Sequence, residues 1–293
     1  MAASTPPHEI TRSQRWRERR TRFLLPDSVI DPTEFAVAEI PRRAARDFVE
    51  AHHYLGSSPP CRVAVGLFRN ARPASRLVGV AMFTVPVQAA ALPLHTGLPA
   101  SAGVELGRLV LLDEVASNGE TWMLRRAFAA LRAARPAVEA VTAYSDPTPR
   151  FGPSGSQIHV GHVGHIYYAY AGPNSYRGQR PSRRVLMTPD GQVFPARTIS
   201  KIRNGERGAA GGVDALVRKG APPPKDHDLR GWFAGLAESG FLTARKAAGV
   251  HAYAFALTRT ARRAAEALPR PPRPVRGPLD PRGDITGLPL FAR

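Results

Sequence analysis

The chain has 293 residues and a hydrophobic content of 43%, enough to bury a sizeable core as one large domain or as one domain with an extension. Its formal net charge of +18 favours a polyanionic partner such as nucleic acid. The alternative is that a GC-rich coding bias produced the high arginine content, because only four of the 41 basic residues are lysines. Cys61 is the single cysteine, which excludes an intramolecular disulfide, argues against a cysteine-based zinc site and indicates the reducing cytoplasm.

Residues 1–34 are predicted to form a basic N-terminal arm. The segment 12–22 contains six arginines and one glutamate, with Trp16 among them. Such a run is typical of an arm that binds nucleic acid, and a solvated tail is the alternative. The candidate contacts are Arg15, Arg17, Arg19 and Arg20.

The first half of the predicted α/β domain, which we place at residues 35–196, begins with a strand over 35–40 and a helix over 41–52. Two apolar runs, 62–70 and 76–85, are separated by turn-forming residues and predict a hairpin. Prolines interrupt the longest apolar stretch, which is shorter than the roughly 20 residues that cross a bilayer. We therefore expect no membrane segment and no signal peptide.

The second half of this domain begins with a strand over 104–113. Ser117 or Asn118 can cap a helix that runs to about Ala134. A further strand ends at Ser145 and Asp146. A core-facing stripe is predicted along the helix at Met123, Ala127, Ala130, Leu131 and Ala134.

A short helix is predicted within 161–178 and a hairpin with an Asp-Gly turn within 183–194. The order of these elements predicts a mixed central sheet with helices on both faces. Residues 197–267 are predicted to form a helical C-terminal extension, with one more possible strand at 250–257, and 268–293 a tail rich in proline and arginine.

Tyrosines are concentrated in one part of the chain, since five of the seven lie between Tyr144 and Tyr176. A buried aromatic patch explains such clustering. However, Asp146 lies among them at the carboxyl end of a predicted strand, where ligands of α/β proteins commonly bind. We therefore predict a functional cleft there.

Two sets of residues in the sequence could bind a metal. His53 and Tyr54, at the end of the first helix, could combine with Asp146 and Tyr167, and imidazole, phenolate and carboxylate ligands together suit iron. The alternative is a zinc site formed by three histidines at a spacing of three residues, but interleaved glycines argue against a rigid scaffold for it. These histidines are His159, His162 and His165.

The segment "SNGET" follows a predicted strand and begins a helix. Asn118, Gly119 and Thr121 could bind a pyrophosphate there through backbone amides and a hydroxyl, although an ordinary helix cap explains them equally well. The sequence contains neither a Walker-type phosphate loop nor a GxSxG motif.

Four segments in this order, "AHHYLGSSPP", "VELGRLVLLDEVASNGETWML", "AYSDP" and "GHVGHIYYAYAGPNSYRG", resemble the phage Mom family of DNA adenine-modification proteins, including its larger actinophage-type members. The similarity covers about residues 12–260. It implies a GNAT-like fold and the conversion of adenine in double-stranded DNA to N6-carbamoylmethyladenine, which protects phage DNA from host restriction.

The resemblance also implies roles for individual residues. His53, Tyr54, Asp146 and Tyr167 correspond to a proposed iron-binding catalytic site, and Arg108 and Thr121, with Asn118 beside them, to a site for an acyl-CoA-type donor. We expect an aromatic wall at Tyr167, Tyr168 or Tyr170 to border the adenine, and Tyr168 and Arg177 to complete the nucleic-acid contacts.

The sequence departs from the family pattern at His165 and Tyr168, and the glycine-spaced pyrophosphate loop of GNAT enzymes is missing, so acetyl-CoA is not assumed as the donor. Two other functions remain open. One is a GNAT-type N-acetyltransferase that acts on a protein or a small-molecule amine. The other is a basic DNA-binding accessory protein without enzymatic activity.

Overall fold

The computed structural model describes residues 29–70, 75–116, 118–148, 150–151, 157–159 and 161–272. The predicted arm contacts Arg15, Arg17, Arg19 and Arg20 lie outside these residues, as does most of the predicted tail. In the part of the chain that is described, no helix is long and apolar enough to cross a membrane.

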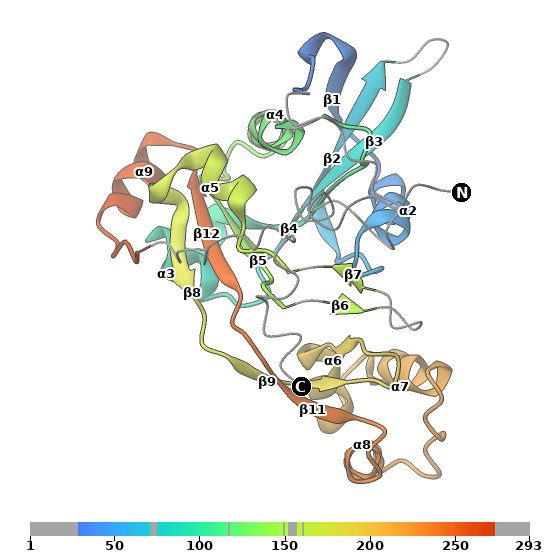
Figure 1. Cartoon of the computed structure of the whole chain (residues 1–293). Helices are drawn as coiled ribbons and strands as arrows, with labels where there is room; N and C mark the ends of the chain where they lie inside the picture. Colours follow the sequence, from blue (N-terminus) through green and yellow to red (C-terminus); the bar gives the residue numbers. More distant parts are fainter. Residues whose placement is uncertain are drawn as a thin grey trace, which may run out of the picture.

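A seven-stranded sheet forms the centre of the molecule (Figure 1). Its strands, in spatial order, are β1 (Phe35–Glu39), β2 (Cys61–Asn70), β3 (Ser75–Thr84), β4 (Gly103–Leu111), β5 (Ala140–Ser145), β12 (His251–Ala256) and β8 (Tyr176–Gln179). Neighbouring strands are antiparallel except β4 and β5, which are parallel because the helix α4 (Gly119–Ala134) crosses over between them. The predicted mixed sheet is confirmed.

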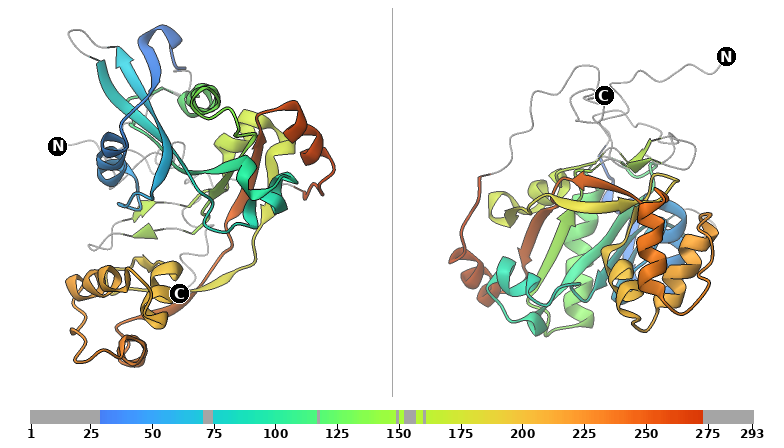
Figure 2. Two further views of the ribbon diagram at one scale, coloured as in Figure 1. Left: turned by 180° about the vertical axis from the view of Figure 1, so that it is seen from behind. Right: turned by 90° about the horizontal axis from the view of Figure 1, so that it is seen from below.

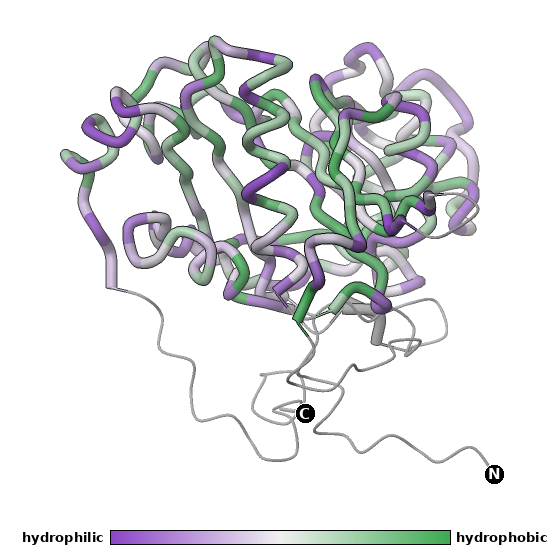
Figure 3. The backbone as a smooth tube through the Cα atoms, turned by 90° about the horizontal axis from the view of Figure 1, so that it is seen from above, coloured by the Kyte–Doolittle hydropathy of each residue, from purple (hydrophilic) through white to green (hydrophobic). Residues whose placement is uncertain are grey.

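Helices cover both faces of this sheet, as the alternation of side chains along β2 and β3 requires. Val65 and Leu67 point into a core that includes residues of α4, whereas Ala64, Val80 and Met82 pack with α2 on the opposite face. The helices are α2 (Arg42–His52) and α3 (Ala91–Thr96) on one face, α4 and α5 (His165–Ala171) on the other, and α9 (Arg259–Glu266) after β12. Figure 3 shows largely hydrophobic strands and hydrophilic residues along the outer helices.

The helix α4 has the predicted core-facing stripe. Met123, Ala127 and Leu131 are fully buried, and Ala130 and Ala134 pack against the same core. The predicted cap by Asn118 is not formed, because its side chain makes no cap hydrogen bond. Its Oδ1 instead accepts a hydrogen bond from the backbone N–H of Ile30 at 3.0 Å. Asn118 has a φ of 60°, in the left-handed region. Ser117 lies outside the described residues.

A second unit is inserted between β8 and β12 and has a core of its own (Figures 1 and 2). It comprises β9 (Arg183–Met187), β10 (Val193–Phe194), α6 (Ala196–Asn204), α7 (Ala209–Arg218), α8 (Leu229–Glu238) and β11 (Thr243–Ala247). Its core contains Phe194, Ile202, Val213, Leu216, Phe233, Leu236 and Leu242. The predicted hairpin is the pair β9 and β10, and Gly191 provides its turn with a φ of 74°.

The predicted boundaries of a catalytic domain at 35–196 and a C-terminal extension at 197–267 do not describe this arrangement. The possible strand at 250–257 is β12, which lies between β5 and β8 near the middle of the sheet. The helices α6–α8 are therefore an insertion within the domain. Periodicity along the sequence identified the strand and the helices, but it carries no information on the partner with which a distant strand pairs.

The sheet opens between β4 and β5, and this opening positions the candidate site. The two strands pair from Gly103 with Ala140 to Leu106 with Ala143. Beyond these residues β4 continues to pair with β3, and β5 with β12. A small two-stranded sheet of β6 (Arg150–Phe151) and β7 (Gln157–His159) follows β5. The carboxyl-terminal parts of β4 and β5 therefore separate and leave space between them.

Candidate active site

A pocket of about 310 Å³ lies where β4 and β5 separate. We call it the split pocket. It is lined by polar side chains from several elements, namely His52, His53, Tyr54, Glu105, Arg108, Glu120, Tyr144, Asp146, His162, Tyr167 and Arg183. The structure thus brings together in one pocket the four residues predicted for the catalytic site, His53, Tyr54, Asp146 and Tyr167.

The end of α2 positions the first two of these residues. The helix ends at His52, because His53 has extended backbone angles, and Gly56 then adopts a φ of 56° in the turn that follows. The rings of His53 and Tyr54 stack with their centroids 4.3 Å apart. The backbone N–H of Leu55 donates a hydrogen bond to Nδ1 of His53 at 3.2 Å. His53 is only 8% exposed and is held in a defined orientation.

Asp146 directly follows β5, as the sequence predicted. The backbone N–H of Thr148 donates a hydrogen bond to Oδ1 of Asp146 at 2.9 Å, and the backbone carbonyl of Asp146 accepts one from His162 at 2.9 Å. Tyr144, two residues earlier, points to the same pocket. Burial, together with the carboxylate of Glu105, raises the pKa of Tyr144 to about 12. The phenol is therefore neutral at physiological pH.

Tyr167 comes from α5, which begins at a close approach of the backbone to another tyrosine. Gly164 precedes the helix with a φ of 81°, and a Cβ atom there would lie 2.5 Å from the ring of Tyr253. The rings of Tyr167 and Tyr253 pack 5.2 Å apart in the main core. Burial raises the pKa of Tyr167, and Tyr54, Tyr253 and Glu105 add to the increase. Tyr167 is thus part of the main core and also lines the split pocket.

Glu105 is a candidate functional residue that the sequence analysis missed. It lies within β4, between Thr84 on one neighbouring strand and Thr142 on the other, and lines the split pocket. Burial raises the pKa of its carboxyl group, while the backbone N–H of Val87 and the charge of Arg108 oppose the increase. An acidic residue within the largely apolar predicted strand, three positions before Arg108, was the signal that could have identified it.

Arg108 lies in the split pocket, next to Glu105 and Tyr54. Its Nε donates a hydrogen bond to the carbonyl of Ser57 at 3.1 Å, and a second nitrogen donates to the carbonyl of Gly107 at 2.6 Å. Burial lowers the pKa of the guanidinium, and Tyr54 and Glu105 counteract this effect. The backbone contacts hold a positive charge in a fixed position beside the carboxylate.

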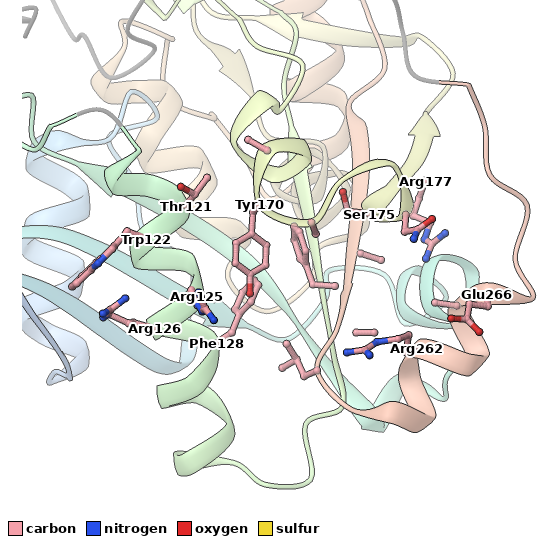
Figure 4. Close-up of a pocket in the computed structure, with 18 of the residues that line it drawn as sticks. Thr121, Trp122, Arg125, Arg126, Phe128, Tyr170, Ser175, Arg177, Arg262 and Glu266 are labelled. Carbon is pink, nitrogen blue, oxygen red and sulfur yellow. The ribbon is translucent and has the colours of Figure 1, made fainter. Parts of the chain in front are cut away.

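The other predicted binding residues are elsewhere. Asn118, Thr121 and Arg177 line a second and larger pocket of about 700 Å³, which we call the arginine pocket (Figure 4). The set predicted for the donor is therefore divided, because Arg108 lines the split pocket and Asn118 and Thr121 do not. Tyr168 packs against the main core and is not among the described residues that line either pocket.

The predicted iron site does not fit the arrangement of these residues. A neutral imidazole has one nitrogen that donates and one that accepts, so Nδ1 of His53, which accepts from Leu55, leaves the proton on Nε2. A metal bound at Nε2 would move that proton to Nδ1, where it would face the Leu55 N–H. Iron stays a prediction.

The alternative zinc site also lacks support in the described part of the chain. His162 lines the split pocket, whereas His165 is the first residue of α5. The backbone of His159 lies in β7, but its side chain is not described. Among the described residues, no three or more side chains of His, Cys, Asp or Glu form a group that could hold a metal ion.

Comparison with known proteins identifies the family. Residues 34–209 match the model of the Mom protein family, and this range contains every polar residue of the split pocket. No curated protein matches the chain. Because the matched range covers more than half of the 293 residues, the chain belongs to the Mom protein family, which is associated with DNA modification.

Proposed function

We propose that the protein modifies adenine in phage DNA at N6, forming N6-carbamoylmethyladenine in the split pocket, and thereby protects the DNA from host restriction. The observation that carries the proposal is the convergence of His53 and Tyr54 from α2, Asp146 from the end of β5 and Tyr167 from α5 on one pocket, in a chain of the Mom family. The net charge of +18 supports DNA as the substrate.

The size of the pocket determines how DNA would enter. A volume of about 310 Å³ accommodates a single base and the reactive end of a donor, but not a double helix. Adenine N6 takes part in base pairing, so the nucleotide has to be extruded from the duplex before it reacts. Tyr54 and Tyr144 line the pocket and supply aromatic rings on which the extruded adenine can stack.

The two carboxylates have different roles in this proposal. Asp146, oriented by the N–H of Thr148, accepts a hydrogen bond from the N6 amino group and positions the base. N6 then forms a bond to the electrophilic carbon of the donor, and the leaving group departs with the electron pair of the broken bond. Glu105 accepts the proton that N6 loses, because a buried carboxylate with a raised pKa is the better base.

Arg108 supplies the positive charge in the proposed reaction. Its two hydrogen bonds to backbone carbonyls fix the guanidinium, so it can stabilise negative charge that develops on the leaving group without reorganisation. The proposal leaves the donor open, because the residues predicted for an acyl-CoA-type donor, Arg108, Asn118 and Thr121, line two different pockets.

The test is the analysis of DNA from cells that express the full chain. The DNA is hydrolysed to nucleosides, and mass spectrometry is used to look for deoxyadenosine with a carbamoylmethyl group. We expect the modified nucleoside with the native chain and its loss with Glu105→Gln. Unmodified DNA together with transfer of an acetyl group from acetyl-CoA to an amine would favour an N-acetyltransferase instead. Unmodified DNA together with DNA binding alone would favour an accessory protein.

A further inference from the structure

The arginine pocket is lined by five arginines from three separate parts of the chain. It lies between α4, α5, β8, the end of β12, and α9. The five are Arg125, Arg126, Arg177, Arg262 and Arg270, and Glu266 is the one carboxylate among the described lining residues. Figure 4 shows Arg125 extending from α4 and Arg262 extending from α9 towards it. Among the described residues, none of the five arginines lies within 4.0 Å of a carboxylate oxygen.

The burial of Arg177 in this pocket does not stabilise the folded chain. Two of its nitrogens, Nε and Nη1, are buried and have no hydrogen-bond partner among the described residues. Burial and the nearby charge of Arg270 lower the pKa of the Arg177 guanidinium. A buried cationic donor without an acceptor is costly, so an anionic ligand that provides acceptors would remove this penalty.

The remaining wall of the pocket is aromatic. The guanidinium of Arg126 lies 3.6 Å from the centroid of the Trp122 ring. Tyr170 packs edge-on against Phe128 at 5.4 Å and against Phe255 at 5.7 Å. All of these side chains line the pocket, which therefore combines several arginines with planar apolar surface.

The amino end of α4 borders the same pocket through Asn118 and Thr121. The Thr121 hydroxyl donates a hydrogen bond to the carbonyl of Asn118 at 2.9 Å and keeps its capacity to accept. The positive end of the helix dipole adds to the charge of the arginines. A ligand with several negative charges fits five arginines better than a single carboxylate does. Phosphate groups suit them well, because arginine often pairs with phosphate oxygens through two parallel hydrogen bonds.

We propose that the arginine pocket binds a phosphate-bearing ligand of the nucleotide class, with the phosphates at Arg177, Arg262 and Arg270 and the planar ring at the aromatic wall. The ligand is either a free nucleotide or a nucleotide of a DNA strand. The proposal goes beyond adenine modification and does not depend on it. Three of the charged lining residues, Arg262, Glu266 and Arg270, lie after residue 209 and outside the range that matches the family.

The experiment measures binding to the full chain by isothermal titration calorimetry. The probes are ADP, pyrophosphate, adenosine and a short single-stranded oligonucleotide. We expect ADP to bind more tightly than adenosine, and Arg177→Met and Arg262→Gln each to weaken ADP binding at least tenfold. Arg43→Gln, at a side chain on α2 that is 86% exposed, is the matched control and should leave binding unchanged.

A second measurement separates binding from folding. Arg177→Met removes a buried charge without a partner, so the variant without ligand should melt at a temperature no lower than that of the native chain. If only the oligonucleotide binds, and the variants weaken it, the phosphates come from DNA. If no probe binds, or if the native chain and both variants bind all probes equally, the proposal is wrong. Adenine modification is measured separately on nucleosides and is not decided by either result.

Discussion

The split pocket and the arginine pocket both border α4 and α5 but differ in the charges that line them. Glu120 and Tyr167 face the split pocket, whereas Thr121 and Tyr170 of the same helices face the arginine pocket. The split pocket combines carboxylates, imidazoles and phenols with Arg108, but the arginine pocket has five arginines and one carboxylate. Most of the groups that can exchange protons thus line the split pocket, and most of the guanidinium groups line the arginine pocket.

The largest expected effect separates the two pockets directly. Glu105→Gln removes the proposed proton acceptor but keeps the shape of the side chain and its capacity to accept from Val87. We expect the rate of adenine modification to fall by about 100-fold or more, as removal of a general base does. ADP binding should stay unchanged, because Glu105 does not line the arginine pocket. Equal losses in both measurements would show that the two pockets are one site.

A smaller effect is expected for Asp146→Asn. The amide oxygen can still accept from the N–H of Thr148, so the loop keeps its shape, but the charged acceptor for adenine N6 is lost. We expect about a tenfold fall in the rate of modification, which corresponds to about 1.4 kcal/mol, with little change in melting temperature. Asp47→Asn, at an exposed carboxylate on α2, is the matched control. An Asp146→Asn variant with the native rate would exclude Asp146 from the reaction.

The third prediction concerns His95, a buried residue of α3. Its ring contacts that of Tyr144 at 5.9 Å, and burial, with the charges of Arg180 and Arg177, lowers its pKa to about 4. The unfolded chain therefore binds a proton below pH 6.5 that the folded chain does not bind until about pH 4. We expect the free energy of unfolding to fall as pH decreases through this range, by at most about 3 kcal/mol.

Urea unfolding at pH 7.5 and pH 5 measures this dependence. His95→Gln should reduce the difference between the two pH values, and Arg177→Met should reduce it to a lesser degree, because one of the charges that depress the pKa is then absent. A native chain with equal stability at both pH values would contradict the prediction. The result for Arg177→Met also shows whether a charge of the arginine pocket affects the pKa of His95, which contacts Tyr144 of the split pocket.

Local patterns predicted most of the main sheet correctly. The strands β1 to β5 and the helices α2, α4 and α5 were identified from apolar periodicity and from Gly and Pro positions. The helix α3 was missed, since it has six residues and contains Pro93. The strand β11 was missed because four of its five residues are exposed, so it has no apolar alternation. The position of β12 depends on pairing with a distant strand, which no local pattern contains.

The sequence predicted only part of the candidate site. Motif positions suggested that His53, Tyr54, Asp146 and Tyr167 act together, and the structure places them in one pocket. Asn118 and Thr121 were expected near Arg108, but they lie on the side of α4 that faces the arginine pocket. That pocket could not be predicted from the sequence, because its arginines come from α4, β8, α9 and the segment after α9 and are adjacent only after folding.

The late position of β12 in the chain has a consequence for synthesis. During translation, β5 emerges from the ribosome roughly 100 residues before β12, which covers its outer edge. The inserted unit has its own core and could fold in this interval, while β5 still exposes unpaired backbone groups. Nascent chains that stop before His251 should therefore aggregate or require a chaperone, and completion of β12 should release them.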